Sequence, residues 1–135
     1  MRLLWHAGLA TGVRQIDLQH QELIDLINEL ESAYETGQDA QALIDVLPRL
    51  SAYAMFHFGT EEGLMEQAAK GTPLEQAHLG EHQLFADKLT LMKNEVDATP
   101  RQTVGKLLDY LKSWLQAHIM KTDKELAKVI LSRTR

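Results

Sequence analysis

The sequence of 135 residues contains no cysteine. Disulfide bonds, zinc–thiolate sites and iron–sulfur clusters are therefore excluded, and any bound metal must be held by nitrogen and oxygen atoms. Long apolar runs are also absent, since none approaches the ~20 residues that a helix needs to cross a bilayer. Basic residues are outnumbered, with 14 Lys and Arg against 19 Asp and Glu and a formal charge of −5. This balance argues against a nucleic-acid partner or an anionic membrane surface, because both require a basic face.

The N-terminus begins with a short apolar stretch that superficially resembles part of a signal peptide. The stretch is brief, is interrupted by His6 and has too little positive charge before it. We therefore expect a cytoplasmic protein without membrane insertion. The balance of 44% apolar and 24% charged residues is typical of a folded globular chain. A single domain over 1–135 should bury roughly two thirds of its unfolded surface.

Apolar residues three or four positions apart recur along nearly the whole chain, and no strand pattern competes with them. Gly37 ends the first of these runs. Pro48 falls inside the second, so we expect a kink there or a helix that begins near it. Thr72, Thr99 and Thr122 each precede a Glu or Gln by three residues, which is the capping-box signature of a helix start.

These signals predict an all-α fold, an up-down-up-down four-helix bundle with short turns between helices of about 20 residues. An N-terminal arm precedes the bundle and a short C-terminal helix follows it. The predicted segments are the arm over 1–16, main helices over 17–36, 39–68, 73–97 and 100–120, and the short helix over 122–132. Neither an internal repeat nor a second domain is indicated.

Each predicted main helix carries at least one residue able to bind a metal. Residues four positions apart share one face of a helix, so both side chains can reach one ion. His57 and Glu61 form such a pair. His78 and His82 form another. His6 lies off any helical pattern and is left out. The candidate metal ligands are His20, His57, Glu61, His78, His82, His118 and Asp123.

A single pair of this kind is often only a solvent-exposed contact worth a few tenths of a kcal/mol. A lone histidine such as His20 is often a core residue bonded to a carbonyl. Here, however, the candidates continue the apolar stripes that must face the core. Burying five imidazoles and two carboxylates along the bundle axis would be very costly without partners, and a bound cation removes that cost.

Asp123 lies five residues after His118, which on an ideal α-helix leaves the two side chains about 140° apart. A π-bulge between them would correct this difference. Alternatively, the fourth helix ends near Met120, and Asp123 belongs to the first turn of the next helix, as the Thr122 capping box suggests. We expect the second arrangement.

Five imidazoles and two carboxylates are too many ligands for one ion and suit two. If both carboxylates bridge and the ions share a solvent oxygen, two six-coordinate ions keep one open position, on the ion with two histidines. Zinc would prefer four-coordinate closure, whereas magnesium and calcium would prefer oxygen ligands. The donor set therefore favours a divalent redox metal pair that takes up a small diatomic ligand.

This set of residues resembles the signature of the hemerythrin family in its bacterial, single-domain form, bacteriohemerythrin. Other similar features are Trp5, the run Gly-Val-Arg-Gln-Ile-Asp-Leu-Gln-His at 12–20, His-Phe at 57–58, Glu-Glu at 61–62, Met65 and His-Ile at 118–119. The likeness covers essentially the whole chain.

The resemblance implies two non-haem iron ions joined by an oxo or hydroxo group. It implies that one iron is held by His78, His82 and His118, the other by His20 and His57, and that Glu61 and Asp123 bridge them. O2 would bind reversibly at the second iron. Around this open position we expect an apolar pocket that keeps water and protons out. The pocket residues are Leu23, Phe58, Trp114, Leu115 and Ile119.

The sequence favours O2 carriage, storage or delivery to an O2-consuming oxidase, by a monomer that is not an enzyme. Di-iron enzymes of the ferritin-like type use mostly glutamates, which stabilise oxidised iron, whereas neutral imidazoles favour ferrous iron and reversible binding. An O2 or redox sensor is an alternative, as is a di-iron enzyme with oxidase, weak peroxidase or NO-scavenging activity.

Overall fold

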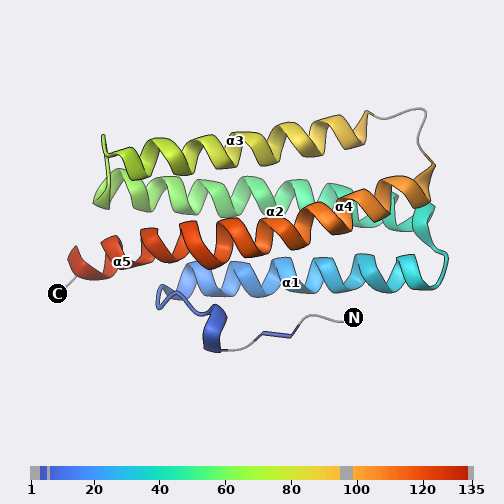
Figure 1. Ribbon diagram of the computed structural model, residues 1–135, viewed down its shortest axis with the longest axis horizontal. Helices are drawn as coiled ribbons and strands as arrows, with labels where there is room; N and C mark the ends of the chain where they lie inside the picture. The colour runs from blue at the N-terminus through green and yellow to red at the C-terminus, as the bar shows by residue number, and fades with distance from the viewer. Residues whose placement is uncertain (1–3, 6, 95–98, 134–135) are drawn as a thin grey trace.

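The computed structural model describes residues 4–5, 7–94 and 99–133 of the chain (Figure 1). Its helices are η1 (Ala7–Leu9), α1 (Arg14–Glu35), α2 (Asp39–Ala68), α3 (Pro73–Lys93), α4 (Pro100–Trp114), η2 (Leu115–Asp123) and α5 (Lys124–Arg133). The four main helices run alternately in opposite directions, which confirms the predicted all-α bundle. His6 and the predicted helical residues 95–97 lie outside the described residues.

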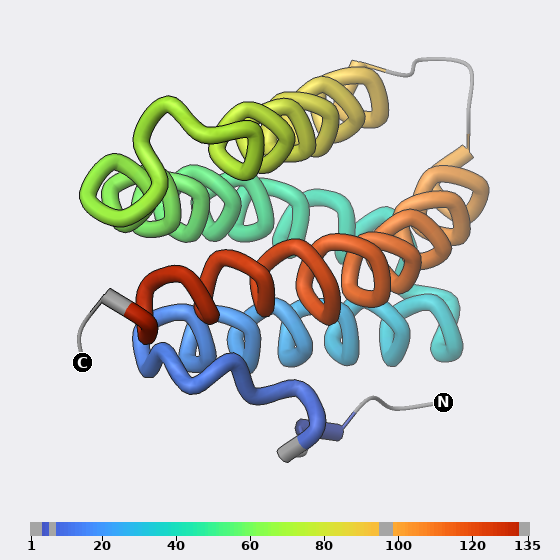
Figure 2. The backbone as a smooth tube through the Cα atoms, turned by 60° about the vertical axis from the view of Figure 1, so that its left-hand side comes forward, coloured from blue at the N-terminus to red at the C-terminus, as the bar shows by residue number. Residues whose placement is uncertain are grey.

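The N-terminal arm lies beside α1, close to the end of the bundle where α5 stops (Figure 2). Trp5 packs against the larger apolar cluster of the core, and the Lys124 ammonium donates a hydrogen bond to the carbonyl of Gly8. These two contacts hold the arm against the helices. In the part of the chain that the structure describes, no helix is long and apolar enough to span a bilayer.

Helix α1 begins at Arg14, three residues before the predicted start. The carboxylate of Asp17 accepts hydrogen bonds from the backbone N–H and the hydroxyl of Thr11 and from the N–H of Gly12. Gly12 has a φ of 90°, in the left-handed region that glycine adopts without strain. Asp17 thus stabilises the turn before the helix from inside the first turn, where a carboxylate also interacts favourably with the helix dipole.

Helix α2 runs without a break from Asp39 through Pro48, so a helix start near Pro48 is ruled out. The proline side chain is exposed at this position. Gly59 in α2 and Gly80 in α3 lie inside helices, where glycine is less favourable than alanine by up to ~1 kcal/mol. A Cβ atom added at either position would meet nothing within 4 Å, so neither glycine is needed for a close approach of helices.

The threonine caps form to different extents. Thr99 and Gln102 make the complete capping box at the start of α4. At α3, the Thr72 hydroxyl accepts from the N–H of Glu75, whereas the Glu75 carboxylate turns to the N–H of Gly71. Helix α3 is described as far as Lys93, with Asn94 as its C-cap.

The predicted break between the fourth helix and the C-terminal helix is wrong. The chain stays helical from α4 into α5 through the π-helix η2, which ends at Asp123 (Figure 1). A π-helix closes its turn on the fifth residue, so His118 and Asp123 come round to the same face. The Thr122 hydroxyl donates to both carboxylate oxygens of Glu81 on α3, at 3.0 Å each, and so does not form the predicted capping box.

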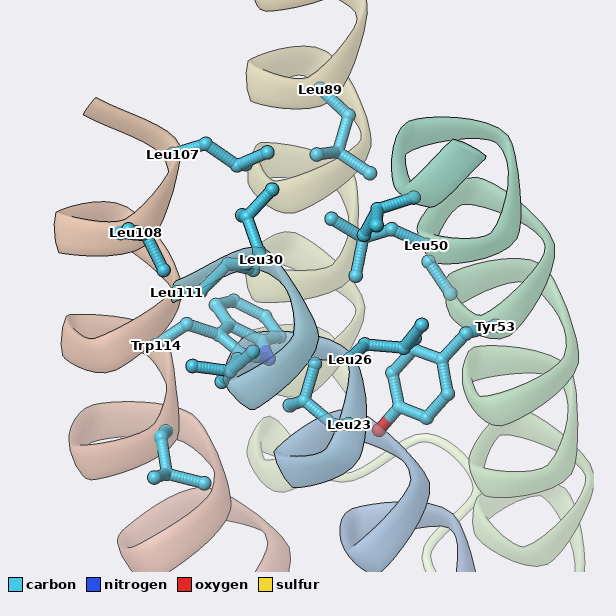
Figure 3. Close-up of a cluster of buried hydrophobic side chains, with 14 of the residues drawn as sticks. Leu23, Leu26, Leu30, Leu50, Tyr53, Leu89, Leu107, Leu108, Leu111 and Trp114 are labelled. Carbon is cyan, nitrogen blue, oxygen red and sulfur yellow. The ribbon is translucent and has the colours of Figure 1, made fainter. Parts of the chain in front are cut away.

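The interior contains two apolar clusters with buried polar residues between them. The larger cluster fills the space between the main helices (Figure 3) and includes the fully buried Leu30, Leu50 and Leu107. The smaller cluster contains Val13, Ile16, Met65, Leu126 and Ala127. On α1, His20 lies between Ile16 of the smaller cluster and Leu23 of the larger one. The candidate site is therefore enclosed by apolar side chains on both sides along the bundle axis.

Candidate metal centre

The structure brings all seven candidate residues together inside the bundle. His20 comes from α1, His57 and Glu61 from α2, His78 and His82 from α3, and His118 and Asp123 from η2. Six of them have no exposed surface, and His82 is 4% exposed. Because these residues come from α1, α2, α3 and η2, which continues α4, the site exists only when the four-helix bundle has formed.

The nitrogen and oxygen atoms of these residues form two groups, in each of which the atoms lie within 4.8 Å of one another. One group contains Glu61, His78, His82 and His118, and the other contains His20, His57, Glu61 and Asp123. Glu61 belongs to both groups. The arrangement therefore suits two neighbouring cations with Glu61 between them.

The two oxygens of Asp123 face different groups of histidines. Oδ1 lies 3.0 Å from Nε2 of His78 and 2.9 Å from Nε2 of His118. Oδ2 lies 2.7 Å from Nε2 of His20 and 3.6 Å from Nε2 of His57. A carboxylate in this position can give one oxygen to each of two cations, so Asp123 can bridge as Glu61 can.

Several buried atoms at the centre of the site have no hydrogen-bond partner among the described residues. They are Nε2 of His57, Oε2 of Glu61, Nε2 of His118 and Oδ1 of Asp123. Leaving such atoms unsatisfied costs roughly 1–3 kcal/mol each, and more for charged groups. Cations would satisfy all of them and would compensate the two buried carboxylates, so the residues present fit a metal pair.

Residues 11–130 match the profile of the hemerythrin HHE cation binding domain. The chain belongs to the hemerythrin family. The family's cation-binding description agrees with the buried histidine and carboxylate groups, which fit the metal site of a di-iron O2-binding protein or a related one.

Proteins named bacteriohemerythrin are similar over most of the chain. The one from Pseudomonas aeruginosa strain LESB58 is 34% identical over 122 residues, which cover 90% of this chain and 76% of the relative. The one from Stenotrophomonas maltophilia is 32% identical and covers 93% of this chain and 79% of the relative. The one from Clostridium acetobutylicum is 26% identical, with 90% and 96% covered.

Three of the histidines at this hemerythrin site have a second partner that the sequence did not single out. Nδ1 of His57 lies 2.6 Å from the amide oxygen of Gln19. Nδ1 of His82 lies 3.0 Å from a carboxylate oxygen of Glu62. Nδ1 of His118 lies 2.9 Å from a carboxylate oxygen of Glu81. These partners are Gln19, Glu62 and Glu81, and each directly adjoins a candidate residue in the sequence.

An amide or carboxylate oxygen can only accept, so these three rings donate from Nδ1 and direct Nε2 toward the site. Such partners fix the tautomer and the orientation of a metal-binding imidazole. Gln19 and Glu62 lie in segments that resemble the family, but nothing in the sequence gave them this role. For Glu81 the only signal was its adjacency to His82, which is weak because polar neighbours are common on helices.

The five predicted pocket residues are all buried, but two of them lie against the three-histidine group. The ring of Phe58 stacks on His82 at 3.9 Å between centroids, and that of Trp114 stacks on His118 at 4.0 Å. Both were predicted beside the group that contains His20 and His57, and the Phe58 ring also lies 5.9 Å from the ring of His57. Leu23, Leu115 and Ile119 belong to the same larger apolar cluster.

The histidine–carboxylate contacts shift the titration of the site strongly. Burial opposes the charged form of His57, but the nearby carboxylates of Asp123 and Glu61 outweigh the effect of burial and raise the pKa of His57 to about 9. Burial also opposes the charged form of His118, but Asp123 and Glu61 outweigh the effect of burial and raise the pKa of His118 to about 10. Burial alone would raise the pKa of Asp123, yet its histidine partners and Glu61 hold it well below the ordinary value. The carboxylates therefore stay charged and attract either protons on the histidines or metal ions.

Proposed function

We propose that this protein binds O2 reversibly at a non-haem di-iron centre, as a carrier, store or source of O2 for an oxidase, and not as an enzyme. The supporting observation is the donor set, in which five buried imidazoles surround only two carboxylates. Neutral nitrogen ligands favour ferrous iron, whereas the glutamate-rich sites of di-iron enzymes favour oxidised iron. The names of the similar proteins agree with this function.

In this proposal the two groups of residues hold one iron each. His78, His82 and His118 would hold one iron, and His20 and His57 would hold the other. Glu61 and Asp123 could serve both ions, since their oxygens lie among the nitrogens of both groups. When bound, two ferrous ions supply reversible two-electron chemistry toward O2. The surrounding residues orient the imidazoles through Nδ1 and exclude water with apolar side chains.

The test is reconstitution of the metal-free chain with ferrous iron under argon, followed by repeated cycles between argon and air. We expect about two iron ions per chain, as in other di-iron bundles, and a colour that appears in air and disappears under argon over many cycles. The variant His78→Ala should lose iron, whereas Gln83→Ala changes an exposed residue of the same helix and should not. A single irreversible oxidation in each cycle would favour an enzyme instead.

A further inference from the structure

Tyr53 is an aromatic residue of α2 that lies one helical turn before His57. Its ring stacks on the imidazole of His57, with 5.3 Å between centroids and 13° between the ring planes. The residue is 4% exposed and belongs to the larger apolar cluster. The side of the site that contains His20 and His57 therefore has a tyrosine against it, whereas Phe58 and Trp114 stack on the other side.

The hydroxyl oxygen of Tyr53 is buried and has no hydrogen-bond partner among the residues that the structure describes. Buried tyrosine hydroxyls usually find a partner, because an unpaired one loses its hydrogen bonds with water. Figure 3 shows the hydroxyl pointing from α2 toward α1, where Leu23 and Leu26 belong to the same cluster. Leu23 follows His20 by one turn of α1.

A tyrosine hydroxyl is protonated at neutral pH, since its ordinary pKa is about 10. The leucines nearby offer no acceptor. The group is thus a hydrogen-bond donor, held by the ring stack beside His57, that no side chain of the described protein uses.

We propose that the Tyr53 hydroxyl donates a hydrogen bond to the small ligand that the centre takes up on its two-histidine side. This role rests on the proposed function, since it requires iron at the site. The Tyr53 hydroxyl would then favour the binding of ligands that carry or gain negative charge, such as azide or O2. A hydrogen bond to a charged acceptor is stronger than one between neutral groups. Its loss should therefore lower the affinity for such a ligand roughly tenfold to hundredfold.

Tyr53→Phe tests the role because it removes the hydroxyl and keeps the ring that stacks on His57. The matched control is Tyr110→Phe, since Tyr110 packs on Phe85 at the same cluster without stacking on a histidine of the site. Two quantities are measured: the azide affinity of the oxidised, iron-loaded protein by absorbance, and the thermal midpoint of the metal-free chain.

We expect Tyr53→Phe to weaken azide binding by the stated factor while the thermal midpoint of the metal-free chain stays equal or rises, because an unpaired buried hydroxyl is lost. Tyr110→Phe should leave azide binding unchanged. A normal iron content with unchanged azide affinity would overturn the role of Tyr53 alone, and so would a weaker affinity accompanied by a lower midpoint of the metal-free chain. A wild-type chain that binds no iron would overturn the proposed function and this role with it.

Discussion

Nε2 of His118 and Oδ1 of Asp123 lie 2.9 Å apart, although the two residues are separated by five positions in the sequence. The π-helix η2 makes this approach possible, because its wider turn returns the fifth residue to the same face. The neighbouring Thr122 points to Glu81 on α3 instead. The site therefore depends on a local departure from α-helical geometry.

Exchanging residues 122 and 123, as Thr122→Asp with Asp123→Thr, tests this dependence. The variant keeps the composition but moves the carboxylate to the position that faces Glu81. We expect the affinity for one of the two metal ions to fall more than about hundredfold. Even the loss of a residue that only orients a metal ligand lowers metal affinity roughly 10–100-fold. Metal content after dialysis against a weak chelator measures the loss. Retention of both ions would show that the π-helical register is unnecessary.

Glu81 should support metal binding although it lies outside the candidate set. It accepts from Nδ1 of His118 and from the Thr122 hydroxyl, and so orients one histidine and fixes η2. We expect Glu81→Ala to lower metal affinity by about 10–100-fold, measured by competition with a chelator. The control is Gln83→Ala, which removes only the exposed contact with Asp87 on the same helix. Equal effects of the two variants would contradict the prediction.

Leu115 should protect the oxygenated state. The residue is 7% exposed and belongs to the apolar cluster that encloses the site. We expect Leu115→Ala mainly to speed autoxidation, because the cavity admits water and protons. Leu108→Ala is the control, since Leu108 is 6% exposed in the same cluster, two helical turns away, and should lose a similar ~2–5 kcal/mol of stability. The decay of the oxygenated absorbance in air gives both rates, and equal rates would refute the assigned role of Leu115.

The metal-free chain should lose stability above neutral pH. The pKa values of His57 and His118, raised from 6.5 to about 9 and about 10, mean that the folded chain binds these protons more tightly than the unfolded chain. Their stabilisation is complete below pH 6.5 and is lost as the pH rises through 9 and 10. The lowered pKa values of Glu61 and Asp123 act in the opposite direction and remove stability in acid. The thermal midpoint should therefore be highest between about pH 4.5 and 6.5, and a flat profile from pH 7 to 10 would count against these protonation states.

Metal loading at pH 7 should release protons, because histidines bind metal in the neutral form. His57 and His118 carry protons at that pH in the metal-free chain, so we expect a release of about two protons per chain from these residues. Calorimetric titration of the metal in two buffers with different ionisation enthalpies measures the number. Identical heats in the two buffers would mean that the histidines are already neutral.

Much of the site could be predicted from the sequence because the pairing of ligands on one helix depends only on residues a few positions apart. A residue and its neighbour four positions on share a helix face whatever the rest of the chain does, so the pairs His57–Glu61 and His78–His82 were visible directly. The same holds for the capping box of Thr99 and Gln102, in which both hydrogen bonds lie within one turn. The helices, their direction and the donor set followed from such short-range patterns.

Contacts between helices decided the rest. Thr122 offered the same local signature as Thr99, but the carboxylate of Glu81 lies 41 positions away in the sequence and takes its hydroxyl. Phe58 adjoins His57 in the sequence yet stacks on His82 of another helix. Periodicity specifies which face of a helix is buried, because that depends on the 3.6-residue turn. Which side chain a buried group meets, and whether a turn widens to place Asp123, depends on how four such faces pack together, and only the tertiary structure determines that.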